Sequence, residues 1–247
     1  MISTKTLNGH RGSVGCLQIS SDGTHLISGS EDNTVRVWEL SSGKPQKCLA
    51  ACFESDIESV RYGYDKNIVY VACTKSIYSF DLRSEGLVSK SPHGQVGLSE
   101  GGDEVSNLAL NAKGDLLAIS MDSGVINLIP VKTNGTFCEN TGATRFKRLS
   151  RFHTNIVNTI TFKKNNPREL LSGGFDYNAC IWDVDRGRPK ASTSFSKLPV
   201  EEKEGESEED NIRQSLQIVN PAFVMAMDYA LGGRCVVAAL GDGTVGI

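Results

Sequence analysis

The feature that most constrains the fold of this chain is a set of four residue types that occurs twice with the same spacing. The first set is His10, Ser28, Asp32 and Trp38, and the second is His153, Ser172, Asp176 and Trp182. In both, Ser precedes Asp by four residues and Asp precedes Trp by six. Because buried polar groups need partners, we expect Asp to accept from imidazole, imidazole to meet the hydroxyl, and the hydroxyl to accept from the indole N–H. The spacing therefore predicts a buried network that joins separate strands.

The residues between these positions have the pattern of strands and turns. Apolar and β-branched residues alternate with polar ones in residues 14–19, 25–28 and 35–38, which is typical of half-buried strands. The sequences Ser-Asp-Gly at 21–23 and Glu-Asp-Asn at 31–33 separate them, as expected for hairpin turns. Nothing in residues 9–40 has a helical pattern, so the repeated unit is predicted to be all-β.

These motifs resemble the WD-repeat β-propellers, whose repeat runs Gly-His, three strands and a closing Trp-Asp pair. Here the repeat begins with Gly9-His10 and the pair is Trp38-Glu39. The resemblance implies one all-β propeller domain over residues 1–247 with five recognisable four-stranded blades. We expect the blades near residues 8–52, 53–102, 103–152, 153–218 and 219–247.

The second and third blades are expected to lack the polar network. In the second, Phe80 stands at the Trp position and Thr74 at the Asp position. In the third, Asp122 keeps its place, but Leu128 replaces Trp and Ala118 replaces Ser. Apolar packing must therefore hold these two blades together.

The number of blades has two interpretations. Residue 248 would be the Trp position of the fifth unit, and most of the family closes with seven blades, so the resemblance implies an incomplete seven-bladed propeller. Alternatively, residues 3–7 could add a strand to the fifth unit and close a five-bladed ring. An acidic insertion near 196–217, which includes Glu-Glu-Lys-Glu-Gly-Glu-Ser-Glu-Glu-Asp at 201–210, is expected to be flexible, and its Ser207 could serve an acid-directed kinase.

Composition limits the class of protein. The net charge is −3, so no overall basic field draws the chain to nucleic acid or membrane. The seven cysteines contain no Cys-x-x-Cys pair, which favours reduced thiols over a disulfide or zinc framework. The N-terminus lacks the apolar core of a signal peptide, and the longest aliphatic run, at 236–240, is too short to span a bilayer. We expect a cytoplasmic or nuclear protein without metal or cofactor.

Three patterns offer other chemistry, and each has a structural alternative. Ser, His and Asp could form a hydrolase triad, but two copies beside a Trp favour a structural network. Residues 241–246 read Gly-x-Gly-x-x-Gly, yet Asp242 corresponds to Asp32, which favours a hairpin over a dinucleotide site. The run Arg145, Lys147, Arg148 and Arg151 could touch phosphates, but no second basic cluster or aromatic platform accompanies it. We expect no enzyme activity and consider nucleic-acid binding unlikely.

The resemblance implies a protein-interaction scaffold, a monomer within a larger complex, that binds proteins or peptides. Some such proteins are substrate receptors of cullin-RING ubiquitin ligases, which present Trp-Asp-x-Arg to the ligase adaptor. The best match here is Phe80-Asp81-Leu82-Arg83, which assigns Asp81 and Arg83 to adaptor binding. A scaffold with no ligase link is the alternative.

A second surface is predicted at the turns between the second and third strands of each blade. The residues just before the Asp position are Glu31, Cys73, Met121, Phe175 and Gly241. We expect Met121 and Phe175 to lie as apolar groups on an exposed rim with Glu31, where a client protein would bind. The alternative is that Phe175 folds onto its own blade and Arg83 is solvated.

Overall fold

The computed structural model describes residues 4–50, 52–98, 103–139, 146–196 and 220–247. Throughout these ranges the regular secondary structure consists of strands, 20 in all, and contains no helix. The prediction of an all-β fold is therefore confirmed.

The strands form five separate sheets, and in each the strands are arranged in chain order. The first sheet contains β1 (Val14–Ile19), β2 (His25–Ser30), β3 (Thr34–Glu39), β4 (Pro45–Leu49) and β8 (Val88–Ser89). The second contains β5 (Ile57–Tyr62), β6 (Ile68–Cys73), β7 (Ser76–Asp81) and β9 (Gly94–Gly97). The third contains β10 (Val105–Leu110), β11 (Leu116–Met121), β12 (Ile126–Pro130) and β13 (Lys147–Leu149). The fourth contains β14 (Thr159–Lys163), β15 (Asn166–Gly173), β16 (Asn178–Asp183) and β17 (Arg188–Ser194), and the fifth β18 (Val224–Ala230), β19 (Cys235–Leu240) and β20 (Val245–Gly246).

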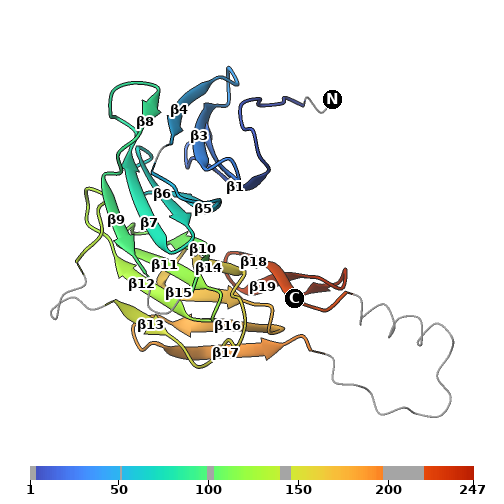
Figure 1. The fold of residues 1–247 in the computed structure, drawn as a ribbon. Helices are drawn as coiled ribbons and strands as arrows, with labels where there is room; N and C mark the ends of the chain where they lie inside the picture. Colours follow the sequence, from blue (N-terminus) through green and yellow to red (C-terminus); the bar gives the residue numbers. More distant parts are fainter. Residues whose placement is uncertain (1–3, 51, 99–102, 140–145, 197–219) are drawn as a thin grey trace, which may run out of the picture.

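The five sheets follow one another around an arc (Figure 1). The first strand of each sheet contacts the first strand of the next, from β1 through β5, β10 and β14 to β18. All pairs within the sheets are antiparallel except β4 with β8. This is the arrangement of blades around a propeller axis.

No five-bladed ring forms within the described residues. Residues 4–10 belong to no strand, and β20 pairs with β19 alone in the fifth sheet. Lys5 instead donates to the carbonyl of Ser41, at 3.1 Å, in the first sheet. The fifth sheet therefore has three strands in the described residues, not the four that we expected of every blade.

The segment from Ser84 to Leu98 has the composition of a loop, rich in Gly, Ser and Pro, but contains two strands. β9 pairs with β7 and completes the second sheet, while β8 crosses to the first sheet and pairs in parallel with β4. The many Gly, Ser and Pro residues of the segment do not predict strands. The strands form because the edges of β4 and β7 offer unpaired backbone groups.

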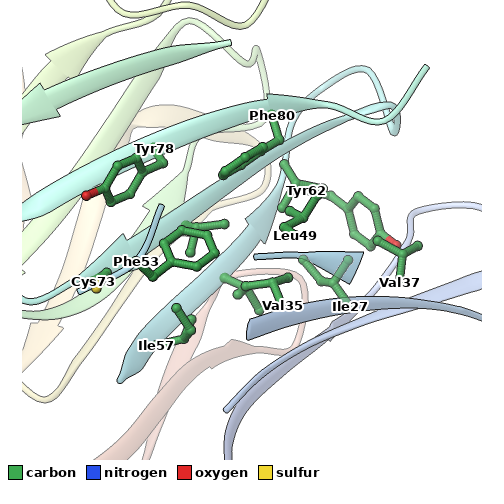
Figure 2. Packing of buried hydrophobic residues seen from close by; sticks show 13 residues of the cluster. Ile27, Val35, Val37, Leu49, Phe53, Ile57, Tyr62, Cys73, Tyr78 and Phe80 are labelled. Atoms are coloured by element: carbon green, nitrogen blue, oxygen red, sulfur yellow. The ribbon is translucent and has the colours of Figure 1, made fainter. Parts of the chain in front are cut away.

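The second sheet has an apolar core, as its missing polar network led us to expect. Phe53 packs edge-on against Tyr78 and Phe80, with ring centroids 5.3 and 5.7 Å apart. Figure 2 shows these rings above Ile57 and Val35, so the cluster joins the second sheet to the first.

Most of the acidic insertion, including Ser207, lies outside the described ranges, and so does Arg145 of the basic run. The expectations for these residues stay predictions. All seven cysteines are described, and all are free of disulfides.

Candidate functional site

The first set of four residues lies in the first sheet and forms a continuous hydrogen-bond network. His10 Nδ1 lies 3.0 Å from Asp32 Oδ2, and His10 Nε2 lies 2.8 Å from Ser28 Oγ. The indole N–H of Trp38 donates to the same Oγ at 2.9 Å. Asp32 also accepts from the backbone N–H of Arg11 at 2.8 Å. The network ties the segment before β1 to β2, the β2–β3 turn and β3.

The second set makes the same contacts in the fourth sheet. His153 Nδ1 lies 3.0 Å from Asp176 Oδ2, and His153 Nε2 lies 2.8 Å from Ser172 Oγ. Trp182 donates to Ser172 Oγ at 2.8 Å. Both polar networks have the form that the repeated spacing predicts.

The geometry supports a structural network over a hydrolase triad. Ser172 is 0% exposed, so its oxygen cannot meet a substrate from solvent. The same oxygen receives the indole N–H of Trp182, which occupies a lone pair that a nucleophile would use. Because the network is buried, its polar groups depend on one another for hydrogen bonds. Removing one member leaves another unpaired and lowers the stability of the fold.

The carboxylates of both networks are stabilised in their charged form. Although burial by itself raises the pKa of Asp32, hydrogen bonds from Thr34, from the Arg11 N–H and from His10 lower it to about 2. For Asp176, burial is again outweighed by the hydrogen bond and charge of His153, and the pKa is lowered. The lowered pKa values mean that both networks favour the folded state at neutral pH.

The second and third sheets have smaller polar contacts at the matching turns. Asp122 accepts from Ser106 Oγ at 2.7 Å, so a serine takes the role that His has elsewhere. Thr74 Oγ1 lies 2.5 Å from Ser55 Oγ. These pairs join the start of each blade to the turn between its second and third strands.

The rim positions differ from one another in exposure. Glu31 is exposed and Phe175 is half-buried, whereas Met121 is 1% exposed. The prediction that Met121 lies on an exposed rim is wrong. β11 is covered on both faces, with alternate residues packed into two neighbouring apolar clusters, and it continues through Met121.

Phe175 is part of an aromatic cluster that the sequence analysis missed. Its ring centroid lies 5.0 Å from that of Phe223, and Phe223 stacks on Tyr177 at 5.2 Å. All three residues are half-buried. We call Phe175, Tyr177 and Phe223 the aromatic rim cluster. Phe223 precedes β18, so the fourth and fifth sheets meet here, and only the fold brings it beside Phe175.

Arg83 lies at the opposite end of the second sheet, after β7. Its side chain is 59% exposed and pairs with Asp81, with Nη2 to Oδ2 at 2.7 Å and Nε to Oδ1 at 2.9 Å. Asp65 lies 3.5 Å from Nη1. The hydrogen bond from Arg83 lowers the pKa of Asp81. The guanidinium is thus accessible and held in one orientation by two carboxylates.

The other candidate motifs have structural roles. Residues 241–244 form the turn between β19 and β20, with Gly243 at a φ of +83°. Asp242 accepts from the Thr244 N–H at 3.0 Å, as Asp32 does from Thr34 at 3.1 Å. In the basic run, Lys147 donates to the backbone carbonyl of Asp185. The glycine motif is therefore a hairpin turn.

No group of three or more His, Cys, Asp and Glu side chains in the ranges given above is placed to hold a metal ion. No helix in that part of the chain is long and apolar enough to cross a membrane.

Comparison with known proteins matches the repeated segments to a family. The pattern described as "WD domain, G-beta repeat" matches residues 1–39 and 146–183. These ranges contain the two complete polar networks, and each ends at or next to the closing Trp. The chain carries WD40 repeats. The first and fourth sheets, which contain these two segments, are accordingly WD40 blades, and the other three sheets have an antiparallel arrangement consistent with propeller blades.

Relatives of this WD40 chain extend the match beyond the two repeats. WD repeat-containing protein 53 homolog of Dictyostelium discoideum is 26% identical over 248 residues, which cover 99% of this chain and 64% of that protein. Eukaryotic translation initiation factor 3 subunit I of Taeniopygia guttata is 23% identical over 67% of this chain and 52% of its own length. Small ribosomal subunit protein RACK1 of Candida albicans is 26% identical over 51% of this chain and 39% of its own length. The WD40 chain thus covers less than two thirds of each relative.

Several features of this sequence predict a resemblance to WD repeat-containing protein 53, and the match to its Dictyostelium discoideum homolog over 99% of this chain is consistent with that prediction. These features are the degenerate second and third blades, His153-Thr-Asn-Ile156 before Phe162 and Pro167, the acidic insertion, and Val219-Asn-Pro-Ala222 before the fifth blade.

Proposed function

We propose that this WD40 chain is a non-enzymatic scaffold that binds a protein or peptide client through the aromatic rim cluster. The observation that carries the proposal is the partly exposed group of three rings at one junction of blades. Aromatic side chains supply much of the energy of protein interfaces because they bury large areas at low entropic cost. Glu31, on the corresponding turn of the first blade, belongs to the same face.

The proposal includes a second partner on the opposite face. Thr74 lies before β7 and Arg83 lies after it. The six residues of β7 place these two positions about 20 Å apart. A protein at each end could therefore bind without touching the other. The motif Phe80-Asp81-Leu82-Arg83 favours a cullin-RING ligase adaptor as the partner of Arg83 and Asp81. A scaffold without a ligase link is the second candidate.

The proposal also covers the assembly state and the cellular location of the protein. Two relatives are a subunit of translation initiation factor 3 and a protein of the small ribosomal subunit. Both are named as members of larger assemblies, which supports a role as a monomer within a complex. We place the protein in the cytoplasm or nucleus, where seven unpaired cysteines would remain reduced.

Replacing Phe175 with alanine is expected to weaken client binding by at least about 30-fold, since central interface aromatics contribute about 2 kcal/mol or more. Clients would be identified by affinity purification with the wild-type chain, and their affinities measured with purified proteins. The control is Tyr64→Ala, because Tyr64 is 78% exposed and lies outside the cluster. Equal affinities of Phe175→Ala and the wild type for every client would refute this surface.

A further inference from the structure

A polar pocket lies between the first and second blades, away from the aromatic rim cluster. Its volume is about 370 Å³, and its lining includes Val37, Lys47, Tyr62, Lys66 and His25. Both sheets contribute to it, since Lys47 belongs to β4 and Tyr62 ends β5. Nothing in the WD40 signature accounts for the polar groups that face it.

Tyr62 has a buried hydroxyl without a partner. The residue is 6% exposed, and no group in the described chain hydrogen-bonds its oxygen. The ring extends towards Val37 in Figure 2, and both side chains line the pocket. Burial raises the pKa of the phenol, so it stays neutral and can donate. An unpaired buried hydroxyl is costly, and a ligand oxygen in the pocket would satisfy it.

Lys47 brings a positive charge to the same wall. It is 8% exposed, and its ammonium donates to the backbone carbonyls of Ser84 and Gly86, the latter at 2.7 Å. No carboxylate of the described chain forms an ion pair with it. Its acceptors, which also include Ser84 Oγ at 3.5 Å, are all uncharged. Because buried cations are normally paired, an anion in the pocket would be attracted by the charge of Lys47.

The other charged groups near the pocket add no excess positive charge. Lys66 is neutralised by Asp22, with Nζ to Oδ2 at 2.6 Å. Arg83 is paired with both Asp81 and Asp65. Of the two lysines that line the pocket, Lys47 is therefore the one without a carboxylate partner in the described chain, and the three carboxylates nearby disfavour a doubly charged phosphate.

We propose that this pocket binds a carboxylate, either of a small organic acid or of an acidic side chain of a bound protein. One oxygen accepts from the Tyr62 hydroxyl, and the charge is stabilised by Lys47. Entry displaces the exposed side chain of Gln46, whose Oε1 lies 3.1 Å from His25 Nε2. The site lies on the side of the blades that carries Arg83 but does not depend on the proposed client surface.

The test is an NMR titration of the whole chain that follows the His25 ring and the backbone amides of the pocket. The probes are propionate, the blocked tripeptide acetyl-Gly-Glu-Gly-amide, its neutral counterpart acetyl-Gly-Gln-Gly-amide, and inorganic phosphate. We expect saturable shifts with both carboxylates and none with the glutamine peptide. Tighter binding of the glutamate peptide than of propionate identifies a protein side chain as the source, and the reverse order identifies a small acid.

Two variants make the assignment specific. Tyr62→Phe removes only the hydroxyl and is expected to weaken carboxylate binding at least about tenfold, because hydrogen bonds to charged groups are strong. Its melting temperature should not fall, since the hydroxyl has no partner to lose. Lys47→Met should abolish binding, while Lys44→Met, on an exposed residue before β4, should leave it unchanged.

The proposal is overturned by any of three results. They are the absence of shifts with both carboxylates, equal shifts with the glutamine peptide, and wild-type affinity in Tyr62→Phe. Tighter binding of phosphate than of either carboxylate would overturn the choice of ligand.

Discussion

Replacing Phe80 with alanine is expected to lower the free energy of unfolding by about 3–5 kcal/mol, the usual cost of removing a fully buried Phe. Phe80 stands where the complete repeats have Trp, and it is 1% exposed. It packs against Phe53 at 5.7 Å in the cluster that joins the first two sheets. With no polar network in the second blade, the cavity would remove its main source of stability.

Urea unfolding followed by circular dichroism would measure the change. Tyr64→Ala serves as the control, because it deletes a ring of similar size from a residue that is 78% exposed. The control should stay within about 0.5 kcal/mol of the wild type. A loss below about 1 kcal/mol in Phe80→Ala would mean that the apolar cluster does not hold the second blade.

Replacing Asp176 with alanine is expected to destabilise the protein by about 1–3 kcal/mol. The side chain of Asp176 is 3% exposed, and that of His153 is 0% exposed. Asp176 accepts from His153 and from the backbone N–H groups of Thr154 and Asn178. Its removal leaves the imidazole of His153, which is fully buried, without this hydrogen-bond partner. For a domain of this size the melting temperature should fall by several degrees.

Asp56→Ala is the matched control, since Asp56 is an exposed residue just before β5. A second readout is the pH dependence. Because the pKa of Asp32 is lowered from 3.8 to about 2, its stabilising contribution is complete above pH 3.8 and is lost as the pH falls through about 2. Asp32→Asn should therefore flatten the loss of stability in that window. A wild-type pH profile in Asp32→Asn, or full stability of Asp176→Ala, would contradict the structural role of the networks.

The two polar networks could be predicted from the sequence because their chemistry is carried by residues at fixed spacing. Only one set of contacts satisfies a buried His, Ser, Asp and Trp together, so the distances follow from the pattern. The blades without these residues are harder to predict from the sequence. Met121 stood at a rim position in the sequence, but a strand packed on both faces buries it.

Other features depend on contacts between segments that are distant in the chain. Phe223 follows Phe175 by 48 residues in the sequence, and only the meeting of two blades brings their rings into contact. β8 is short and lies in a segment with the composition of a loop, so its pairing with β4 cannot be inferred from local pattern. The pocket beside Tyr62 likewise arises from the packing of two sheets.

The most direct test of two separate binding faces is a reciprocal purification with Phe175→Ala and Arg83→Ala. Proteins that co-purify with each variant and with the wild type would be quantified by mass spectrometry, and Arg186→Ala, which changes an exposed Arg at a corresponding turn, serves as the control for Arg83. We expect Phe175→Ala to lose one set of partners and keep those of Arg83, and Arg83→Ala to do the opposite. Loss of the same partners from both variants, or of none from either, would contradict the two-face scaffold.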